Sequence, residues 1–371
     1  METRKLLSRN SHALWIFILI LLFSRAVSHA EPSGRASARA TLAQAARPGG
    51  TTRPFYEGKT IQMIIPFAPA GSTDISARVV AKYLGKHIPG NPGVVTQNMP
   101  GAAGVIGANH LYTVAKRDGL TIATISRANY LEQMVGRPEV RFDFRKYSWI
   151  GSFNYAPMML ACRTDTGYTS LDKIRAAKTP PRIGQGGSGS ISFIFSSLVE
   201  EALKLKFHNV MGFKSGRDTD LGIERGEADC RASSDITIIR SPWPEWREKG
   251  FMTFLLQQGP KKSRVLPQEI PTVYELASTD AKPVLDLMDI MLAYTEFVVP
   301  FAAPPEIPGE LLQILRDSFE KMLADPGFAA EAKKLVDWDG SYLTGEQLQA
   351  RIEKTVSQPP EITKRIKEIL Q

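Results

Sequence analysis

The stretch IQMIIPFAPAGSTDISARVVAKYLG, residues 61–85, decides the fold. Residues 61–67 form a short, nearly continuous apolar run, which is typical of a parallel strand buried on both faces. Small residues follow over 68–73, and the apolar side chains of 74–85 then recur at helical spacing. We therefore predict a strand, a tight turn and a helix, which together form the opening unit of an α/β domain.

The same alternation of strand and helix continues along the chain. Further strands are predicted at residues 94–97, 120–126, 158–163, 182–184, 209–213, 228–232 and 253–257. Helices are predicted at residues 108–115, 170–177, 191–203 and 219–225. Beyond residue 308 the chain is mostly helical, with N-terminal capping signals at Asp325 and Thr344. This alternation predicts an α/β fold in which each domain has a mainly parallel sheet flanked by helices.

The first 54 residues have the pattern of an export signal followed by a tether. Basic residues precede an apolar run at 13–23, and Ser28-His29-Ala30 supplies the small residues of a cleavage site. As a helix the run would span about 16 Å, much less than a membrane anchor needs. We expect residues 1–30 to be a signal peptide cleaved after Ala30, residues 31–54 to be a flexible linker, and the mature protein to reside in the periplasm.

Length, composition and charge exclude several classes of protein. The chain has 371 residues, enough for two domains, and its hydrophobic content of 43% is ordinary for a globular protein. A polytopic membrane protein and a wholly disordered one are therefore excluded. The net charge is +8, and the first 54 residues contribute six of these charges. The folded part thus lacks the basic excess of a nucleic-acid-binding protein.

The two cysteines, Cys162 and Cys230, are too few for a disulfide framework or a thiolate zinc cluster. Both lie in apolar, strand-like segments, where cysteine commonly acts as a small hydrophobic residue. We expect free, buried thiols. The alternative is one disulfide, which requires Cα atoms within about 7 Å of each other.

The sequence offers no strong catalytic or metal-binding candidates. His87, His110 and His208 are the histidines beyond the predicted signal, and none stands at a metal-ligand spacing from Cys, Asp or Glu. A nucleophile elbow of the type G-x-S-x-G is also missing from the sequence. We predict that the protein is not an enzyme and that it holds no metal.

Two strand-to-helix turns are candidates for anion binding, and the first follows the strand at 61–67. Its small residues let a ligand approach the backbone at a helix start, where free N–H groups and the helix dipole favour an anion. The candidate ligand-binding residues here are Ala70, Gly71, Ser72, Thr73 and Asp74. Because like charges repel, Asp74 is better suited to cap the helix or to pair with Arg78 than to contact the anion.

The second turn, GQGGSG at residues 184–189, fits G-x-G-x-x-G between a predicted strand and a predicted helix. A dinucleotide site would need an acidic residue at the tip of the next strand, but that strand ends at residues 211–214 without one. The other interpretation is a second anion-binding helix start. Its candidate ligand-binding residues are Ser188, Gly189 and Ser190.

Four motifs in fixed order carry a resemblance to a known family. They are YEGK at 56–59, PFAPAGSTDISAR at 66–78, NMPGAAGVIGAN at 98–109 and KRDG at 116–119. Together they resemble the solute-binding receptors of tripartite tricarboxylate transporters, a family of bacterial periplasmic binding proteins. The matching stretch extends from residue 56 to residue 370.

The resemblance implies a two-domain Venus-flytrap fold without a cofactor. It places domain 1 at residues 55–155 and 297–371 and domain 2 at residues 156–296, with hinge crossings near 153–158 and 294–299. It also implies a small carboxylate ligand held by the two turns, and membrane permease subunits as partners. We expect a monomer that binds no nucleic acid.

The sequence departs from the family pattern at places that concern the ligand. Ala70 stands where the family usually has glycine, and Arg231 follows an otherwise typical strand entry at residues 224–229. Arg217 and Arg231 are candidate ligand-facing cations, and Ser233 joins them as a candidate. A carboxylate receptor is the leading hypothesis. An exported dinucleotide-dependent oxidoreductase that uses Gly184 to Gly189, and a ligand sensor for a signalling partner, remain as alternatives.

Overall fold

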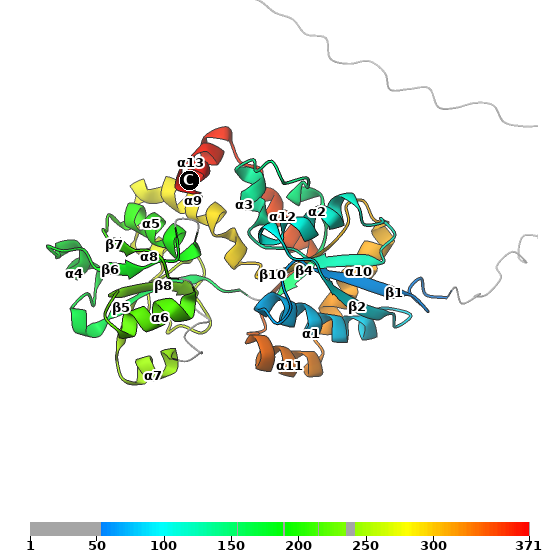
Figure 1. Cartoon of the computed structure of the whole chain (residues 1–371), viewed down its shortest axis with the longest axis horizontal. Helices are drawn as coiled ribbons and strands as arrows, with labels where there is room; N and C mark the ends of the chain where they lie inside the picture. Colours follow the sequence, from blue (N-terminus) through cyan, green and yellow to red (C-terminus); the bar gives the residue numbers. More distant parts are fainter. Residues whose placement is uncertain (1–52, 154, 188–189, 214, 235–241, 371) are drawn as a thin grey trace, which may run out of the picture. The chain divides into compact units, whose positions relative to one another are not determined.

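The computed structural model describes residues 53–153, 155–187, 190–213, 215–234 and 242–370. The predicted signal peptide, most of the predicted linker, and Ser188 and Gly189 of the second turn lie outside these residues. The described chain forms two β-sheets surrounded by helices, which confirms the α/β class (Figure 1). No helix within the described ranges is long and apolar enough to cross a membrane.

The first sheet has six strands in the order β11-β4-β10-β3-β1-β2. These strands are β1 (Thr60–Ile65), β2 (Gly93–Asn98), β3 (Thr121–Thr124), β4 (Ser148–Phe153), β10 (Val299–Ala303) and β11 (Tyr342–Thr344). Both faces of β1 are covered, because Met63 and Ile65 belong to one apolar cluster and Ile64 belongs to another. This agrees with the continuous apolar run from which the strand was predicted.

The second sheet has five strands in the order β7-β6-β8-β5-β9. These are β5 (Met158–Arg163), β6 (Arg182–Gly184), β7 (His208–Val210), β8 (Cys230–Ser234) and β9 (Met252–Gln257). The chain changes from the first sheet to the second between Phe153 and Met158, and β10 returns it to the first sheet at Val299.

Helices cover both sheets. Around the first sheet lie α1 (Ser72–His87), α2 (Val105–Thr113), α3 (Asn129–Met134), α10 (Gly309–Leu323), α11 (Pro326–Val336) and α12 (Gly345–Val356). Figure 1 shows α1 and α11 on one side of this sheet and α2, α3 and α12 on the other. The remaining helices are α4 (Leu171–Ala176), α5 (Ile191–Leu203), α6 (Gly216–Glu224), α7 (Trp243–Glu248), α8 (Val273–Leu276), α9 (Lys282–Met291) and α13 (Pro360–Leu370).

Local capping follows the sequence closely. Asp325 caps α11 ahead of a proline at the first helical position, and its side chain accepts from the N–H of Gly327. Thr344 and Gln347 form the predicted capping box at the start of α12. The last helix, α13, contacts α9, and its Arg365 forms an ion pair with Glu201 of α5 at 3.0 Å.

The sheets are mixed, so the prediction of mainly parallel sheets is wrong for part of each. β1 runs parallel to β2 and β3, and β6 runs parallel to β7 and β8. However, β10 is antiparallel to β3 and β4, and β5 is antiparallel to β8 and β9. β5 and β10 are the strands by which the chain enters one sheet after leaving the other. They enter from the edge where the parallel strands end, so they must run in the direction opposite to those strands.

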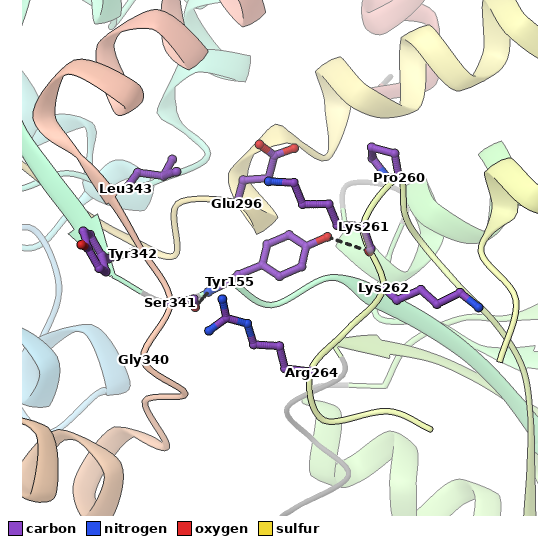
Figure 2. A pocket seen from close by; sticks show the side chains of 10 residues that line it. All are labelled: Tyr155, Pro260, Lys261, Lys262, Arg264, Glu296, Gly340, Ser341, Tyr342 and Leu343. Atoms are coloured by element: carbon purple, nitrogen blue, oxygen red, sulfur yellow. Dashed lines mark hydrogen bonds between the residues drawn. The ribbon is translucent and has the colours of Figure 1, made fainter. Parts of the chain in front are cut away.

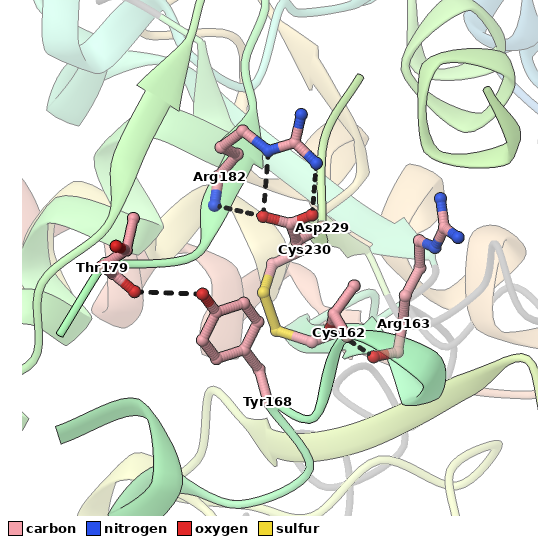
Figure 3. The surroundings of a disulfide bond; sticks show 8 residues. Cys162, Arg163, Tyr168, Thr179, Arg182, Asp229 and Cys230 are labelled. Atoms are coloured by element: carbon pink, nitrogen blue, oxygen red, sulfur yellow. Dashed lines mark hydrogen bonds and ion pairs between the residues drawn. A yellow bond between two sulfur atoms is a disulfide. The ribbon is translucent and has the colours of Figure 1, made fainter. Parts of the chain in front are cut away.

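Cys162 and Cys230 form a disulfide, so the expectation of free thiols is wrong (Figure 3). They are direct partners in the antiparallel register of β5 and β8, with Cα atoms 4.0 Å apart. That separation lies well within the reach of a disulfide. Beside the bond, the carboxylate of Asp229 accepts from the backbone and guanidinium N–H groups of Arg182. The pairing of β5 with β8 is a tertiary feature, and strand propensity alone does not reveal it.

Candidate functional site

The turn between β1 and α1 carries the first group of predicted ligand-binding residues. Ala70 has a φ of 67°, in the left-handed region, and α1 begins at Ser72 with Gly71 as its N-cap. Gly71 and Ser72 are exposed, and Thr73 is half-buried. The first N–H groups of a helix have no acceptor within the helix, and this is the basis of the predicted anion site.

Asp74 is buried in this turn and organises it. Its carboxylate accepts from the Ala70 N–H at 2.9 Å, from the Arg78 guanidinium at 2.9 Å and from the Asn98 amide at 2.8 Å. The predicted pairing with Arg78 is therefore confirmed. Burial alone would raise the pKa of Asp74, but the hydrogen bonds from Arg78, Asn98 and Ala70 outweigh burial and lower it. The carboxylate thus stays charged and fixes the turn ahead of the helix.

The turns after β1, β2 and β3 converge. Asn98, the last residue of β2, also donates to the Phe67 carbonyl oxygen at 2.9 Å, which ties the first turn to the second strand. Gly104 has a φ of 94°, and a Cβ added there would lie 2.8 Å from Cβ of Ser126 and 3.4 Å from Cβ of Pro66. Only a residue without a side chain permits this approach. The loops at the carboxyl ends of the three parallel strands therefore meet at one edge of the first sheet.

The turn between β6 and α5 carries the second group of predicted residues. Ser190 is the N-cap of α5, and its hydroxyl accepts from the Phe193 N–H at 3.3 Å. Gln185 is fully buried and donates to the Ser196 hydroxyl at 2.8 Å. The interactions of Gln185 and Ser190 hold the two ends of the turn against the body of α5.

The predicted cations differ sharply in their surroundings. Arg231 is only 6% exposed and donates to the Asp220 carboxylate at 3.1 Å and to the Gly216 carbonyl oxygen at 3.4 Å. Its side chain is therefore engaged within the protein. Arg217 is exposed at the start of α6, and Ser233 is buried in β8 opposite Met159 of β5. Among the described residues no cluster of His, Cys, Asp and Glu could hold a metal ion.

A comparison with known protein families shows to which family the chain belongs. Residues 76–367 match the family described as the tripartite tricarboxylate transporter family receptor. The chain belongs to this family. The resemblance inferred from the four motifs is thereby confirmed.

Individual relatives of this family cover nearly the whole chain. A protein of Cupriavidus necator, named "UPF0065 protein in gbd 5'region", is 25% identical over 90% of this chain and 95% of its own length. A solute-binding protein of the family from Polaromonas, solved without ligand, has a TM-score of 0.65 at 19% identity and covers 85% of this chain and 99% of its own. The two-domain fold of periplasmic binding proteins is thus shown for this chain.

Arg127 is a further cation at this edge of the sheet that the sequence motifs do not single out. Arg127 directly follows Ser126 at the end of the β3 segment and is half-buried. Its guanidinium carbon lies 5.5 Å from the centre of the Tyr294 ring. Within the described part of the chain, no carboxylate forms an ion pair with it. The only sequence signal was its position after a predicted strand, at the edge where α/β sheets bind ligands.

The receptor also contains a cavity of about 270 Å³ that none of the predicted site residues lines (Figure 2). Its walls come from Tyr155, the loop 260–264, Glu296 and residues 340–343. The Tyr155 hydroxyl donates to the Lys261 carbonyl oxygen at 3.3 Å, and Glu296 is bound by the guanidinium of Arg351. Figure 2 shows the Arg264 side chain extending into this cavity.

Proposed function

We propose that this chain is an exported receptor that binds a small carboxylate and delivers it to membrane permease subunits for uptake. The observation that carries the proposal is membership of a receptor family whose fold is shared by proteins solved with dicarboxylates. MatC of Rhodopseudomonas palustris was solved with malate, at a TM-score of 0.53 and 17% identity. Another protein of that organism was solved with adipate, at 0.55 and 16%. These relatives suggest a small dicarboxylate as the ligand class.

The proposed binding site joins the two turns. Backbone N–H groups and hydroxyls of residues 71–73 would hold a carboxylate from one side, and those of residues 188–190 would hold it from the other. The fixed carboxylate of Asp74 supports this arrangement, because its bond to the Ala70 N–H shapes the loop that the ligand would approach. Charge-assisted hydrogen bonds of this kind are stronger than neutral ones.

The proposed domains follow the two sheets, with residues 55–155 and 297–371 in domain 1 and residues 156–296 in domain 2. A ligand that contacts both domains would favour a closed state over an open one. Small-angle scattering on the monomeric protein should show a smaller radius of gyration after a saturating acid is added. An unchanged radius would contradict closure, and a doubled mass would contradict the monomer.

Export is the second part of the proposal. We propose cleavage after Ala30, so the secreted protein should begin at Glu31. N-terminal sequencing of protein recovered from the periplasm tests this directly. A mature chain that still contains residues 13–23 would contradict a free periplasmic receptor.

The decisive experiment is calorimetry with malate, succinate, adipate and citrate, each beside its amide or ester. We expect at least one acid to bind with roughly micromolar affinity and its amide to bind far more weakly. Native mass spectrometry of protein from the periplasm supplies an independent identification of a co-purified acid. Equal binding of acids and amides would overturn carboxylate recognition. Binding of NADH with inert acids would instead favour the dinucleotide interpretation of residues 184–189.

A further inference from the structure

Arg127 occupies a particular place in the first sheet. It lies in the loop after β3, next to the Ser126 side chain that packs against Gly104. The same Gly104 packs against Pro66, where the loop toward the predicted anion-binding turn begins. The contact pattern therefore places Arg127 in the group of loops that meet at the carboxyl edge of β1, β2 and β3. Open α/β sheets bind their ligands at this edge.

Among the residues that the structure describes, no carboxylate balances the charge of Arg127. Its described contact is the face of Tyr294, and a cation over a ring is only partly compensated for lost hydration. Burial lowers the pKa of Arg127, but a guanidinium stays charged in proteins. By contrast, Arg351, whose side chain is only 15% exposed, binds the carboxylate of Glu296 at 2.8 Å. The free energy of hydration that such a partly buried cation loses is compensated only when an anion binds to it.

Two buried polar residues close to Arg127 in the sequence have side-chain atoms without hydrogen-bond partners among the described residues. Thr124 is fully buried, and its hydroxyl has no hydrogen-bond partner among the described protein atoms. Asn129 is 1% exposed, and both the N and the O of its side-chain amide lack a hydrogen-bond partner in the described part of the chain. Buried polar groups are ordinarily paired, so several unpaired groups within six residues mark a site that needs a polar occupant.

We propose that Arg127 is the residue that recognises the carboxylate of the ligand, with its guanidinium fork donating two hydrogen bonds to the two oxygens. The Tyr294 ring acts as a platform that orients the guanidinium. This inference rests on the proposed function and sharpens it, because it assigns specificity to a side chain rather than to backbone N–H groups alone. It selects an acid with a free, planar carboxylate over the amide or ester of the same shape.

The test compares Arg127→Gln and Arg127→Lys with the wild type, using the tightest-binding acid among malate, succinate, adipate and citrate. We expect Arg127→Gln to weaken acid binding by roughly 10- to 100-fold and to abolish the preference for acid over amide. Arg127→Lys keeps the charge but loses the fork, so an intermediate loss is expected. Arg141→Gln, at an exposed arginine, is the control and should bind within about twofold of the wild type.

Each outcome separates the two proposals. If the wild type binds an acid and both Arg127 variants bind it equally well, the role of Arg127 is overturned and the carboxylate receptor stands. If the wild type binds none of the acids, both proposals fail together. Thermal unfolding without ligand checks that the variants fold. If Arg127→Gln does not fold, the ratio of acid affinity to amide affinity is measured for Arg127→Lys instead. A ratio equal to that of the wild type would contradict the proposed pair of hydrogen bonds from the Arg127 guanidinium to the carboxylate.

Discussion

Arg231 is buried and Arg127 is half-buried, and the surroundings of the two side chains differ completely. Arg231 in β8 has a buried carboxylate, Asp220, and two backbone carbonyl oxygens as acceptors. Arg127 after β3 has a tyrosine ring. Burial lowers the pKa of both arginines, and at Arg231 the charge of Asp220 acts in the opposite direction. The described contacts thus satisfy Arg231 within the protein, whereas Arg127 is the arginine to which we assign the carboxylate of the ligand.

Breaking the Arg231 pair should have the largest effect on stability. Asp220→Asn would leave Arg231 buried without its counter-charge and so place it in the situation of Arg127. We expect a loss of about 3–5 kcal/mol in the free energy of unfolding, measured by denaturant titration. Asp172→Asn, at an exposed partner of Arg175, is the control and should cost less than about 1 kcal/mol.

A substitution at Arg127 tests the other half of this comparison. Arg127→Gln removes a cation that none of the described carboxylates balances, so we expect the free energy of unfolding to change by less than about 1 kcal/mol. If Asp220→Asn and Arg127→Gln destabilised the protein equally, the distinction between the two arginines would be wrong.

Gly104 tests whether the loop that holds Arg127 depends on close packing. Gly104→Val forces a side chain into left-handed backbone and against Ser126, at a cost of about 2–4 kcal/mol. Gly167→Val is the matched control, because Gly167 has a φ of 80° but no atom within 4 Å of an added Cβ. The difference in the free energy of unfolding between the two variants, measured by chemical denaturation, isolates the contribution of loop packing. A difference near zero would show that the loops need no such contact.

Asp74 gives a pH-dependent test of the neighbouring turn. Its pKa is lowered in the folded protein, so its contribution to stability is present above the ordinary carboxyl range near pH 4 and is lost as pH falls through the lowered value. Asp74→Asn should cost about 1–2 kcal/mol at pH 7. The gap between variant and wild type should narrow below about pH 4, as followed by unfolding at several pH values. A gap that is constant down to pH 2 would argue against the charged network.

The smallest effect is expected at Ala70, where the sequence departs from the family pattern. Ala70 has a left-handed φ of 67°, so Ala70→Gly relieves backbone strain but adds freedom to the unfolded chain. We expect a change within about 1 kcal/mol in thermal unfolding, together with equal or tighter acid binding. Asn91→Gly, at a φ of 47°, is the control for the conformational effect alone. Weaker acid binding by Ala70→Gly would mean that the methyl group assists the ligand.

Local patterns in the sequence predict much of the fold, whereas the partners of the arginines depend on tertiary structure. Strand β5 and helix α5 occupy the predicted residues, because apolar spacing and capping are short-range properties. The antiparallel direction of β5 depends on where the chain enters the sheet, and the disulfide depends on the register that follows from it. The sequence makes Arg231 a candidate ligand-facing cation because it departs from the family pattern, and its ion pair with Asp220 becomes visible only in the tertiary structure. The proposed role of Arg127 has no sequence signal of this kind, because the lack of an ion-pair partner among the described residues leaves no mark in a sequence.

The disulfide bears on when the protein becomes fully stable. A bond between cysteines 68 residues apart in the sequence removes many conformations from the unfolded chain and contributes about 2–5 kcal/mol. Disulfides persist in oxidising compartments and are rare in the cytosol. For an exported chain, this stabilisation is therefore withheld during synthesis, when the polypeptide must stay loose enough to be translocated. If the chain is exported as proposed, the bond would form after the membrane has been crossed, and β5 and β8 would then be joined in the compartment where the receptor meets its ligand.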